Sequence, residues 1–298
     1  MDKYKAWLIL VLCNLFWAGN YIFGKYVVAE MTPLWMTTAR WLGALVLLVP
    51  LAQIFERPQW KQVFRHWFLL LCMGLLGSVM YNFTLYEALQ FTSSTSAAFV
   101  QALNPAVLVV FAMIFLRERL QGKQWAGLLV SLVGVVVLLC KGDWNVLLQA
   151  EYNRGDLLMV VAVVVWSVYT LLSKKASGIP PIAATAVSTF FSVVVMLPFA
   201  LAQGFDASKL TSVGMMGMAY IVLFPSVGSY ILWSVGVRAI GPSQAGVFLN
   251  FIPLFTALIS LLLGQSITFS QVLGGGLILL GVYFTSRRQE KIREEFNQ

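Results

Sequence analysis

Aromatic and polar side chains recur near the middle of long apolar runs, and their types suit ligand binding better than catalysis. Two such groups lie at helical spacing along their runs: Trp17, Asn20 and Tyr21, then Trp166, Tyr169 and Thr170. An indole N–H in an apolar setting needs a hydrogen-bond partner, and aromatic faces can hold the apolar body of a solute. We expect both groups to line a cavity, and tight helix packing is the alternative explanation.

Further polar side chains at similar spacing extend this candidate cavity. They are Ser78, Tyr81 and Asn82, then Gln101 and Asn104, and in the second half of the chain Ser229, Tyr230, Trp233 and Asn250. A polar face on a lipid-embedded helix must point toward the protein interior. Some of these groups would then bridge neighbouring helices rather than contact a solute.

Two prolines, Pro105 and Pro253, sit close to the middle of their apolar runs. A proline removes one amide donor and frees the carbonyl four residues upstream, which must find a partner in lipid. Paired interruptions at corresponding places in two halves of a transporter point to a binding site. The amides of Asn104 and Asn250 accompany the two kinks and favour this interpretation over a simple packing kink.

Ionisable side chains within the runs are functional candidates because burying a charge in lipid is expensive. Arg40 lies about six residues, or roughly 9 Å, into its run, where it could snorkel outward or pair with Glu87, and a structural role is favoured. Lys25 and Lys174 end two runs, where they would anchor the interface, attract a solute or gate its passage. None of the twelve acidic residues lies near the midpoint of a run, so a proton relay on mid-membrane carboxylates lacks its parts.

The cysteines and the single histidine give no sign of a metal site or a cofactor. Cys13, Cys72 and Cys140 are far apart in sequence, and His66 has no second histidine or cysteine nearby. A membrane-embedded enzyme would need a nucleophile, a general base or a metal, and no cluster of His, Asp and Glu is evident. We therefore expect no metal, no cofactor and no enzymatic activity.

The elements that must position these residues are membrane-spanning helices. The 298 residues are 59% hydrophobic and only 11% charged, so a bilayer rather than water is the expected solvent. The apolar runs predict an all-α protein with about ten spans, each near the roughly 20 residues that cross a bilayer. These spans are 6–27, 34–55, 66–86, 94–116, 124–140, 156–174, 181–202, 213–237, 243–263 and 271–286.

The net charge of +8 reflects topology rather than a nucleic-acid surface, because the basic residues sit in short loops. With both termini inside, fifteen of the twenty Lys and Arg residues fall on the cytoplasmic side. Positively charged loops stay cytoplasmic, so the sequence predicts a multi-pass protein of a bacterial-type inner membrane with an N-in, C-in topology.

The two halves of the chain repeat one another at a shift of about 147 to 151 residues. Trp17 falls on Trp166 and Pro105 falls on Pro253. The predicted halves are 1–148 and 149–298, with five spans each. An odd number of spans makes the second half enter the membrane from the opposite face, which gives an inverted repeat typical of secondary transporters.

These residues resemble the EamA-type transporters of the drug/metabolite transporter superfamily over nearly the whole chain. The resemblance rests on Phe16 to Asn20 with Lys25, Ala88-Leu89, Ser93 to Ala98, Asn104-Pro105, Arg117 to Arg119, Gly127 and Gly134. One departure is Gly264-Gln265, where such proteins often have Gly-Glu, so no role for that carboxylate carries over. The resemblance implies ten helices around a central cavity, alternating access and export, and its members handle many solutes.

An aromatic and neutral-polar cavity suits a small amphipathic or zwitterionic solute, and amino acids are the leading class. Nucleosides, sugars, drugs and organic cations stay open as alternatives, although the missing cavity carboxylate weakens the case for cations. A channel or a non-transporting receptor would be a different class of function. We expect a monomer whose partners are a small-molecule substrate and the lipid bilayer, with no nucleic acid.

Overall fold

The protein is helical wherever its structure is described. The computed structural model describes residues 3–91, 100–101, 103–117, 121–140, 143–145, 154–262, 264 and 268–286, and these ranges contain no β-strand. The first helices are α1 Lys3–Glu30, α2 Pro33–Phe55, α3 Trp60–Arg65, α4 Trp67–Met73, η1 Gly74–Met80, α5 Tyr81–Phe91, α7 Asn104–Leu116 and α8 Gly122–Cys140. The later ones are α10 Arg154–Lys175, η2 Ala176–Gly178, α11 Pro181–Gln203, η3 Ala207–Lys209, α12 Ser212–Ile221, η4 Val222–Gly228, α13 Ser229–Ile240, α14 Pro242–Val247, η5 Phe248–Asn250, α15 Phe251–Leu262 and α16 Phe269–Ser286.

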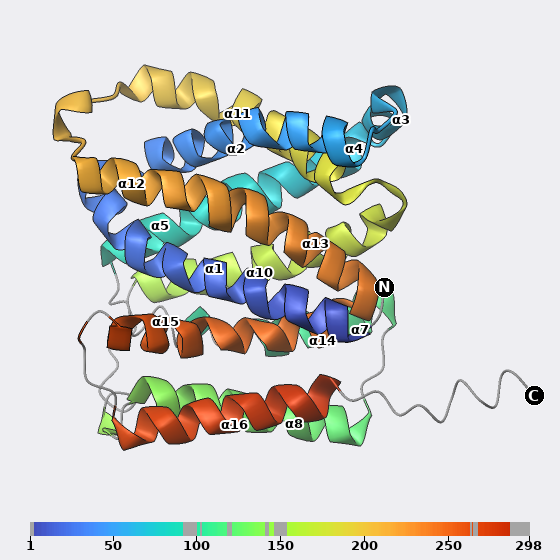
Figure 1. The fold of residues 1–298 in the computed structure, drawn as a ribbon, viewed down its shortest axis with the longest axis vertical. Coiled ribbons are helices and arrows are strands. Elements are labelled where there is room, and N and C mark those ends of the chain that lie inside the picture. The colour runs from blue at the N-terminus through green and yellow to red at the C-terminus, as the bar shows by residue number, and fades with distance from the viewer. Residues whose placement is uncertain are drawn as a thin grey trace, which may run out of the picture.

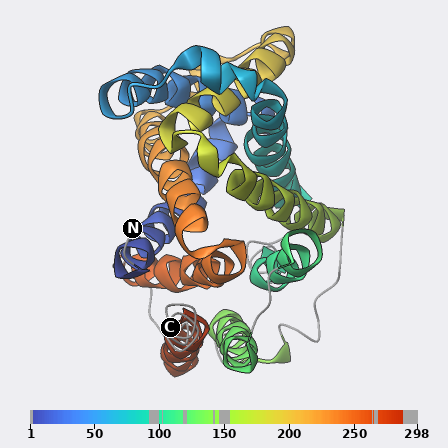
Figure 2. The same cartoon turned by 90° about the vertical axis from the view of Figure 1, so that its right-hand side faces the viewer.

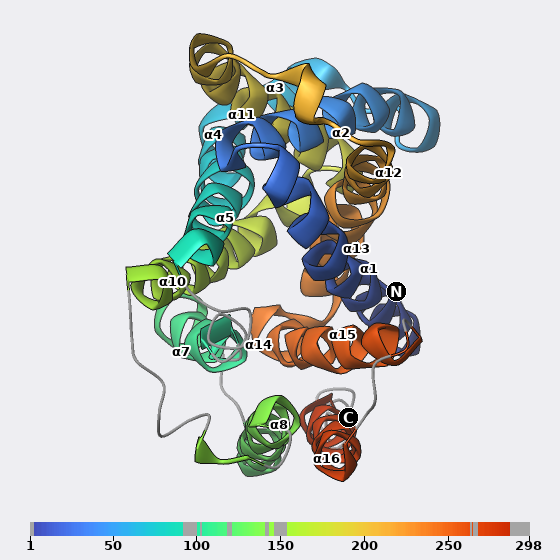
Figure 3. The same ribbon diagram turned by 90° about the vertical axis from the view of Figure 1, so that its left-hand side faces the viewer.

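The helices lie across the longest axis of the molecule and are stacked along it (Figure 1). One end holds α2, α4 and α11, and the middle holds α1, α5, α10, α12 and α13 (Figure 3). Next come α7, α14 and α15, and the pair α8–α16 lies at the opposite end (Figure 2). Helices from early and late parts of the chain therefore alternate throughout the bundle rather than forming two separate bodies.

Helices occupy the apolar runs that the sequence predicts. Among the described residues, seven helical stretches are long and apolar enough to cross a membrane. Three shorter apolar helices, Asn104–Leu116, Gly122–Leu138 and Val272–Thr285, fall in the remaining runs. The expected span 94–116 begins in residues 92–99, which lie outside the described part. The all-helical class is confirmed, and the count of ten spans and their orientation stay predictions.

Two of the long helices contain a wider, π-helical stretch at matching places. η1 begins at Gly74 and joins α4 to α5, and η4 begins at Val222 and joins α12 to α13. The two stretches begin 148 positions apart. This offset falls within the shift at which the sequence repeats. Runs of π-helix are rare and concentrate at functional sites. The apolar runs alone do not predict these π-helical stretches, although Gly74, Gly77 and Pro225 mark both as unusual helix.

Helices α8 and α16 are antiparallel and touch through glycines. A Cβ atom on Gly134 would lie 2.7 Å from the Ile278 amide nitrogen and 2.8 Å from the Gly274 carbonyl oxygen. A Cβ on Gly127 would lie 2.7 Å from the Gly281 carbonyl oxygen. Only a residue without a side chain lets two backbones approach this closely, which is how lipid-embedded helices gain packing energy.

The two candidate prolines lie in different helical settings. Pro105 lies in the first turn of α7, where a proline costs little because the early amides of a helix have no intrahelical partner to lose. Pro253 lies inside a continuous helical run from Pro242 to Ile259, directly after the 3-10 turn η5. The helix is therefore locally distorted just before Pro253. A kink at either proline stays a prediction.

Candidate functional site

A pocket lies where helices from both halves of the chain meet. Eleven side chains line it: Trp17, Asn20, Arg40, Tyr81, Asn82, Leu85, Gln101, Trp166, Tyr230, Leu249 and Ile252. They come from α1, α2, α5, α10, α13, η5 and α15, and from the described residues before α7. The empty volume is about 390 Å³, which includes open space at the mouth of the pocket.

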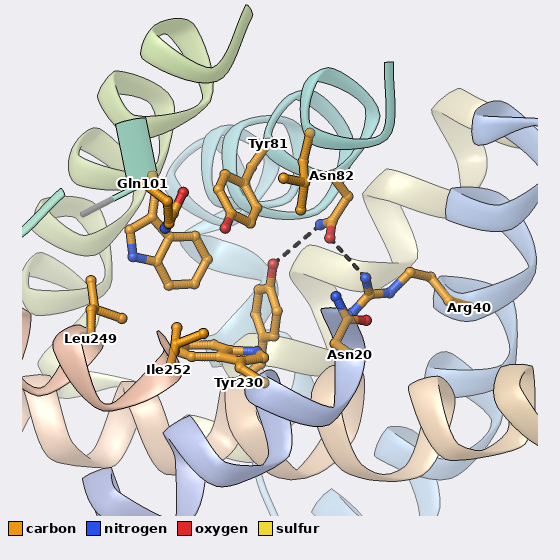
Figure 4. A pocket seen from close by; sticks show the side chains of 11 residues that line it. Asn20, Arg40, Tyr81, Asn82, Gln101, Tyr230, Leu249 and Ile252 are labelled. Carbon is orange, nitrogen blue, oxygen red and sulfur yellow. Dashed lines mark hydrogen bonds between the residues drawn. The ribbon is translucent and has the colours of Figure 1, made fainter. Parts of the chain in front are cut away.

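The two ends of the pocket differ in chemistry (Figure 4). Arg40 and Asn20 lie on one side, Gln101 and Leu249 lie on the opposite side, and the ring of Tyr230 stands between them. The pocket therefore offers a charged, polar end and a mostly apolar end to anything that enters it.

Aromatic rings form the wall between these ends. The ring centroids of Trp17 and Trp166 are 5.1 Å apart in an edge-to-face arrangement, and Tyr81 lies 4.7 Å from Trp166. Tyr230 stands edge-on to both indoles, at 6.0 Å and 5.7 Å. Such pairs add to the energy of area burial and hold the rings in defined positions. The two central tryptophans thus share one wall, as their equivalent places in the repeat suggested.

Arg40 supplies the charge in the pocket wall. Its side chain is 1% exposed. The Nε atom donates to Ser226 Oγ at 2.9 Å, and Nη1 donates to Asn82 Oδ1 at 2.8 Å and to the Tyr86 phenol oxygen at 2.7 Å. Arg40 therefore neither snorkels outward nor has Glu87 among its hydrogen-bond partners, because α2 turns this side chain into the bundle.

The π-helical stretch η1 presents carbonyl groups beside the pocket. The Gly77 carbonyl accepts from the Tyr230 hydroxyl at 2.6 Å and from Asn82 Nδ2 at 3.1 Å. The Ser78 carbonyl accepts from Asn82 Nδ2 and from Trp41 Nε1, both at 3.0 Å. A widened turn leaves carbonyls without regular helical partners, so side chains must satisfy them in lipid. These bonds hold Asn82 and Tyr230 in fixed orientations.

Two polar atoms in the pocket wall have no hydrogen-bond partner within the described part of the protein. They are Oε1 of Gln101 and Nε1 of Trp166, one an acceptor and the other a donor. A buried polar atom left unpaired costs about 1–3 kcal/mol. A solute that bonded to either atom would relieve this cost.

Seven of the residues predicted as cavity-lining come together in the pocket: Trp17, Asn20, Tyr81, Asn82, Gln101, Trp166 and Tyr230. Of the four ionisable candidates, Arg40 lines the pocket with them. The side chains of Tyr21 and Lys25 lie outside the described part of the structure. Contact of any of these residues with a transported solute stays a prediction.

Several other candidates bond neighbouring backbone or helices instead of lining this pocket. Ser229 Oγ donates to the Cys13 carbonyl at 3.0 Å, which joins α13 to α1. Thr170 Oγ1 donates to the Trp166 carbonyl at 3.0 Å and accepts from Trp233 Nε1 at 3.3 Å. These bonds belong to the helix-bridging alternative that the sequence left open.

The remaining polar candidates are buried near the pocket but outside its lining. Asn250 Nδ2 donates to Ser131 Oγ at 2.8 Å and so ties η5 to α8. Asn104 is fully buried, and neither atom of its amide bonds another described group. The ring of Tyr169 packs on Gly77, where an added Cβ would lie 2.4 Å from the ring.

The two other described ionisable candidates lie away from the pocket lining. Lys174 Nζ donates to the Arg238 carbonyl at 3.0 Å, near the end of α13, which suits an anchoring role. Glu87 accepts from Gln90 Nε2 at 3.2 Å on its own helix. A gating role for either residue stays a prediction. Among the described residues, no three His, Cys, Asp or Glu side chains gather as a metal site.

Three apolar residues of the pocket were missed by the sequence analysis, namely Leu85, Leu249 and Ile252. Their side chains carry no polar or charged atom, which is the signal on which most of the candidates rest. Leu85 lies one turn after Tyr81 on the same helical face, and Leu249 lies 148 positions after Gln101. Helical spacing and the repeat could therefore have found two of the three.

The chain matches the model of the EamA-like transporter family twice, over residues 5–140 and 153–287. It is 26% identical to the uncharacterised transporter YyaM of Bacillus subtilis over 293 residues, which covers 96% of this chain and 95% of that protein. It is 28% identical to an uncharacterised transporter of Archaeoglobus fulgidus, covering 96% of this chain and 99% of that protein.

A further relative carries a named activity. The aromatic amino acid exporter YddG of Ancylobacter novellus is 28% identical over 193 residues, which covers 64% of this chain and 66% of that protein. A protein of known crystal structure superposes with a TM-score of 0.76 at 20% identity and covers 100% of both chains, which supports the fold alone. With both family matches together spanning most of its length, the chain belongs to the EamA-like transporter family and is a multi-pass membrane transporter.

Proposed function

We propose that this transporter moves small amphipathic metabolites, amino acids foremost, out of the cell across the inner membrane by alternating access. The observation that carries the proposal is the pocket, which has a charged end, an aromatic wall and an apolar end. An amino acid with an apolar side chain has the same division between a polar head and an apolar body. The aromatic amino acid exporter among the relatives supports the same class of solute.

An inverted repeat of five spans in each half would create this pocket at its symmetry axis. Residues that are equivalent in two symmetric halves touch one another only near that axis. Trp166 follows Trp17 by 149 positions, Tyr230 follows Asn82 by 148, and each pair is in contact. Secondary transporters bind their solutes near such an interface, which both halves can close in turn.

The glycine contacts between α8 and α16 support the same symmetry. Gly274 and Gly281 each follow an equivalent glycine, Gly127 and Gly134, by 147 positions. Gly127 faces Gly281, and Gly134 faces Gly274, so exchanging the halves reproduces the same two contacts. We accordingly retain halves of 1–148 and 149–298, ten spans, and both termini in the cytoplasm as parts of the proposal.

Counterflow into proteoliposomes tests the proposal directly. Vesicles loaded with one unlabelled solute receive the same solute with a label outside, in a panel of aromatic and small neutral amino acids, nucleosides, sugars and organic cations. A carrier accumulates label transiently and saturably, and we expect this with amino acids. Protein-free vesicles are the control, and a pH gradient across the membrane shows whether protons are coupled.

Two results would contradict the proposal in different ways. Saturable counterflow of organic cations without amino acids would keep the carrier and replace its substrate class. Label entry that rises linearly with concentration, or no entry at all by folded protein, would indicate a channel or a receptor instead.

A further inference from the structure

We propose that Arg40 is the binding residue for a carboxylate on the transported solute, and that an α-ammonium group is dispensable. The inference rests on the proposed function and concerns the same pocket, for which it names the chemical requirement. A solute would place its carboxylate at the Arg40 end and its apolar body along Trp17 and Trp166.

The hydrogen bonds of Arg40 leave one side of its guanidinium unused. An arginine side chain has five N–H donors. One Nε donor and two Nη1 donors are used on Ser226, Asn82 and Tyr86. Both donors of Nη2 make no bond within the described residues, and the side chain lines the pocket. Figure 4 shows Arg40 reaching in from α2 beside Asn20 and Asn82.

The charge of Arg40 lacks a counter-ion in the described part of the protein. Its three partners are neutral, and no carboxylate occurs among the described residues that line the pocket. The Trp41 ring lies 5.2 Å from the guanidinium carbon and compensates the charge only in part. A buried cation without an anion is unfavourable, and a carboxylate forms strong charge-assisted hydrogen bonds with a guanidinium. An anionic group of the solute would complete the site.

The opposite end of the pocket offers no comparable anchor for an ammonium group. Gln101, Leu249 and Ile252 form it, and the free Oε1 atom of Gln101 is a neutral acceptor. A hydrogen bond from an ammonium to an amide carbonyl is weaker than a pair of opposite charges. The pocket therefore selects for the carboxylate of an amino acid much more strongly than for its amino group.

Three matched compounds test this requirement on the wild-type protein. Phenylalanine has both charged groups, 3-phenylpropionate lacks the amine, and phenethylamine lacks the carboxylate. The purified protein in detergent is heated with each compound while its unfolding temperature is measured. We expect phenylalanine and 3-phenylpropionate to raise that temperature at concentrations at least about tenfold below those at which phenethylamine acts. Equal shifts with all three compounds would overturn the proposal.

Substitution of Arg40 provides the second test, and the ratio between ligands guards against a purely structural effect. Arg40→Gln removes the charge, and Arg40→Lys keeps it while losing the planar fork. We expect Arg40→Gln to weaken 3-phenylpropionate binding at least about tenfold more than phenethylamine binding, and Arg40→Lys to restore part of the preference. If Arg40→Gln weakens the binding of both ligands by the same factor, Arg40 has a structural role alone.

Ser226→Ala is the matched control, because it removes one bond to Arg40 but leaves the charge in the pocket. Its preference for 3-phenylpropionate over phenethylamine should stay close to that of the wild type. Should Arg40→Gln fail to fold, the three-compound series on the wild type still decides the question. Absence of counterflow across the panel contradicts the proposed function, whereas equal binding of the three compounds contradicts the role of Arg40 only.

Discussion

The α8–α16 pair and the helices that line the pocket are stabilised in different ways. We call α1, α2, α5, α10, α13 and α15 the pocket bundle. In α8–α16 the helices meet through Gly127, Gly134, Gly274 and Gly281, and shape complementarity supplies the contact. In the pocket bundle the contacts are buried hydrogen bonds and aromatic pairs around one charge, Arg40.

The difference shows how a membrane protein can contain a polar site at all. Lipid gives no hydrogen bonds, so a polar cavity survives only where neighbouring side chains satisfy its groups. The π-helical stretch η1 exposes carbonyls that Asn82 and Tyr230 then satisfy. In the described part of the chain, the α8–α16 pair encloses no polar cavity and combines glycine packing with hydrogen bonds between Gln124 and Thr285. Substitutions in the two regions should therefore separate stability from solute binding.

The largest effect is expected in the glycine contact. Gly134→Leu places a side chain where even a Cβ atom would lie within 2.8 Å of backbone atoms of α16. We expect a loss of about 3 kcal/mol of stability and little folded protein. Gly276→Leu is the matched control on α16, because nothing lies within 4 Å of its Cβ position. Fluorescence-detected gel filtration measures the amount of folded protein for both variants. Normal folding of Gly134→Leu would contradict the close contact.

Asn82→Leu should damage both stability and binding. The substitution leaves Arg40 with one partner fewer and two carbonyls of η1 without their amide donor. We expect a loss of about 2 kcal/mol of stability together with impaired counterflow. Asn82→Asp separates the effect on binding from the effect on stability. Its carboxylate would neutralise Arg40 and should weaken carboxylate binding more than Asn82→Leu does. Tighter binding of 3-phenylpropionate by Asn82→Asp would contradict that view.

Trp166→Phe should change binding more than stability. It keeps an aromatic ring in the wall but removes an N–H that has no partner among the described residues. If a solute accepts this hydrogen bond, the half-saturation concentration for counterflow should rise roughly tenfold, equivalent to about 1.4 kcal/mol.

Trp41→Phe provides the reverse case, because its N–H donates to the Ser78 carbonyl outside the pocket lining. Trp41→Phe should lower the unfolding temperature while leaving the half-saturation concentration for counterflow nearly unchanged. Equal half-saturation in Trp166→Phe and the wild type would remove the Trp166 N–H from the binding site.

Gln124→Ala should have the smallest effect, confined to stability. Gln124 accepts a hydrogen bond from the Gln121 amide and donates to the Thr285 carbonyl, so it joins α8 to α16. We expect a loss of about 1 kcal/mol in thermal unfolding and counterflow kinetics like those of the wild type. A clear change in half-saturation would mean that the peripheral pair takes part in solute binding.

The sequence by itself determined the helical class, the place of nearly every long helix and the aromatic and polar residue types of the pocket. Apolar runs predict helices without any knowledge of packing, because backbone polar groups in lipid must be satisfied within the segment. Helical spacing then placed Trp17 and Asn20 on one face and Tyr81 and Asn82 on another. The repeat indicated that Trp17 and Trp166 are equivalent.

Only the tertiary structure decided which polar groups face the pocket and which bridge helices. Periodicity defines a face, but the neighbour on that face depends on helices far away in sequence. Asn250 thus bonds Ser131 on α8, whereas Tyr230 reaches Gly77 and the pocket. The burial of Arg40 among neutral partners needs α5 and η4 to meet α2, and no local pattern in the chain encodes that meeting.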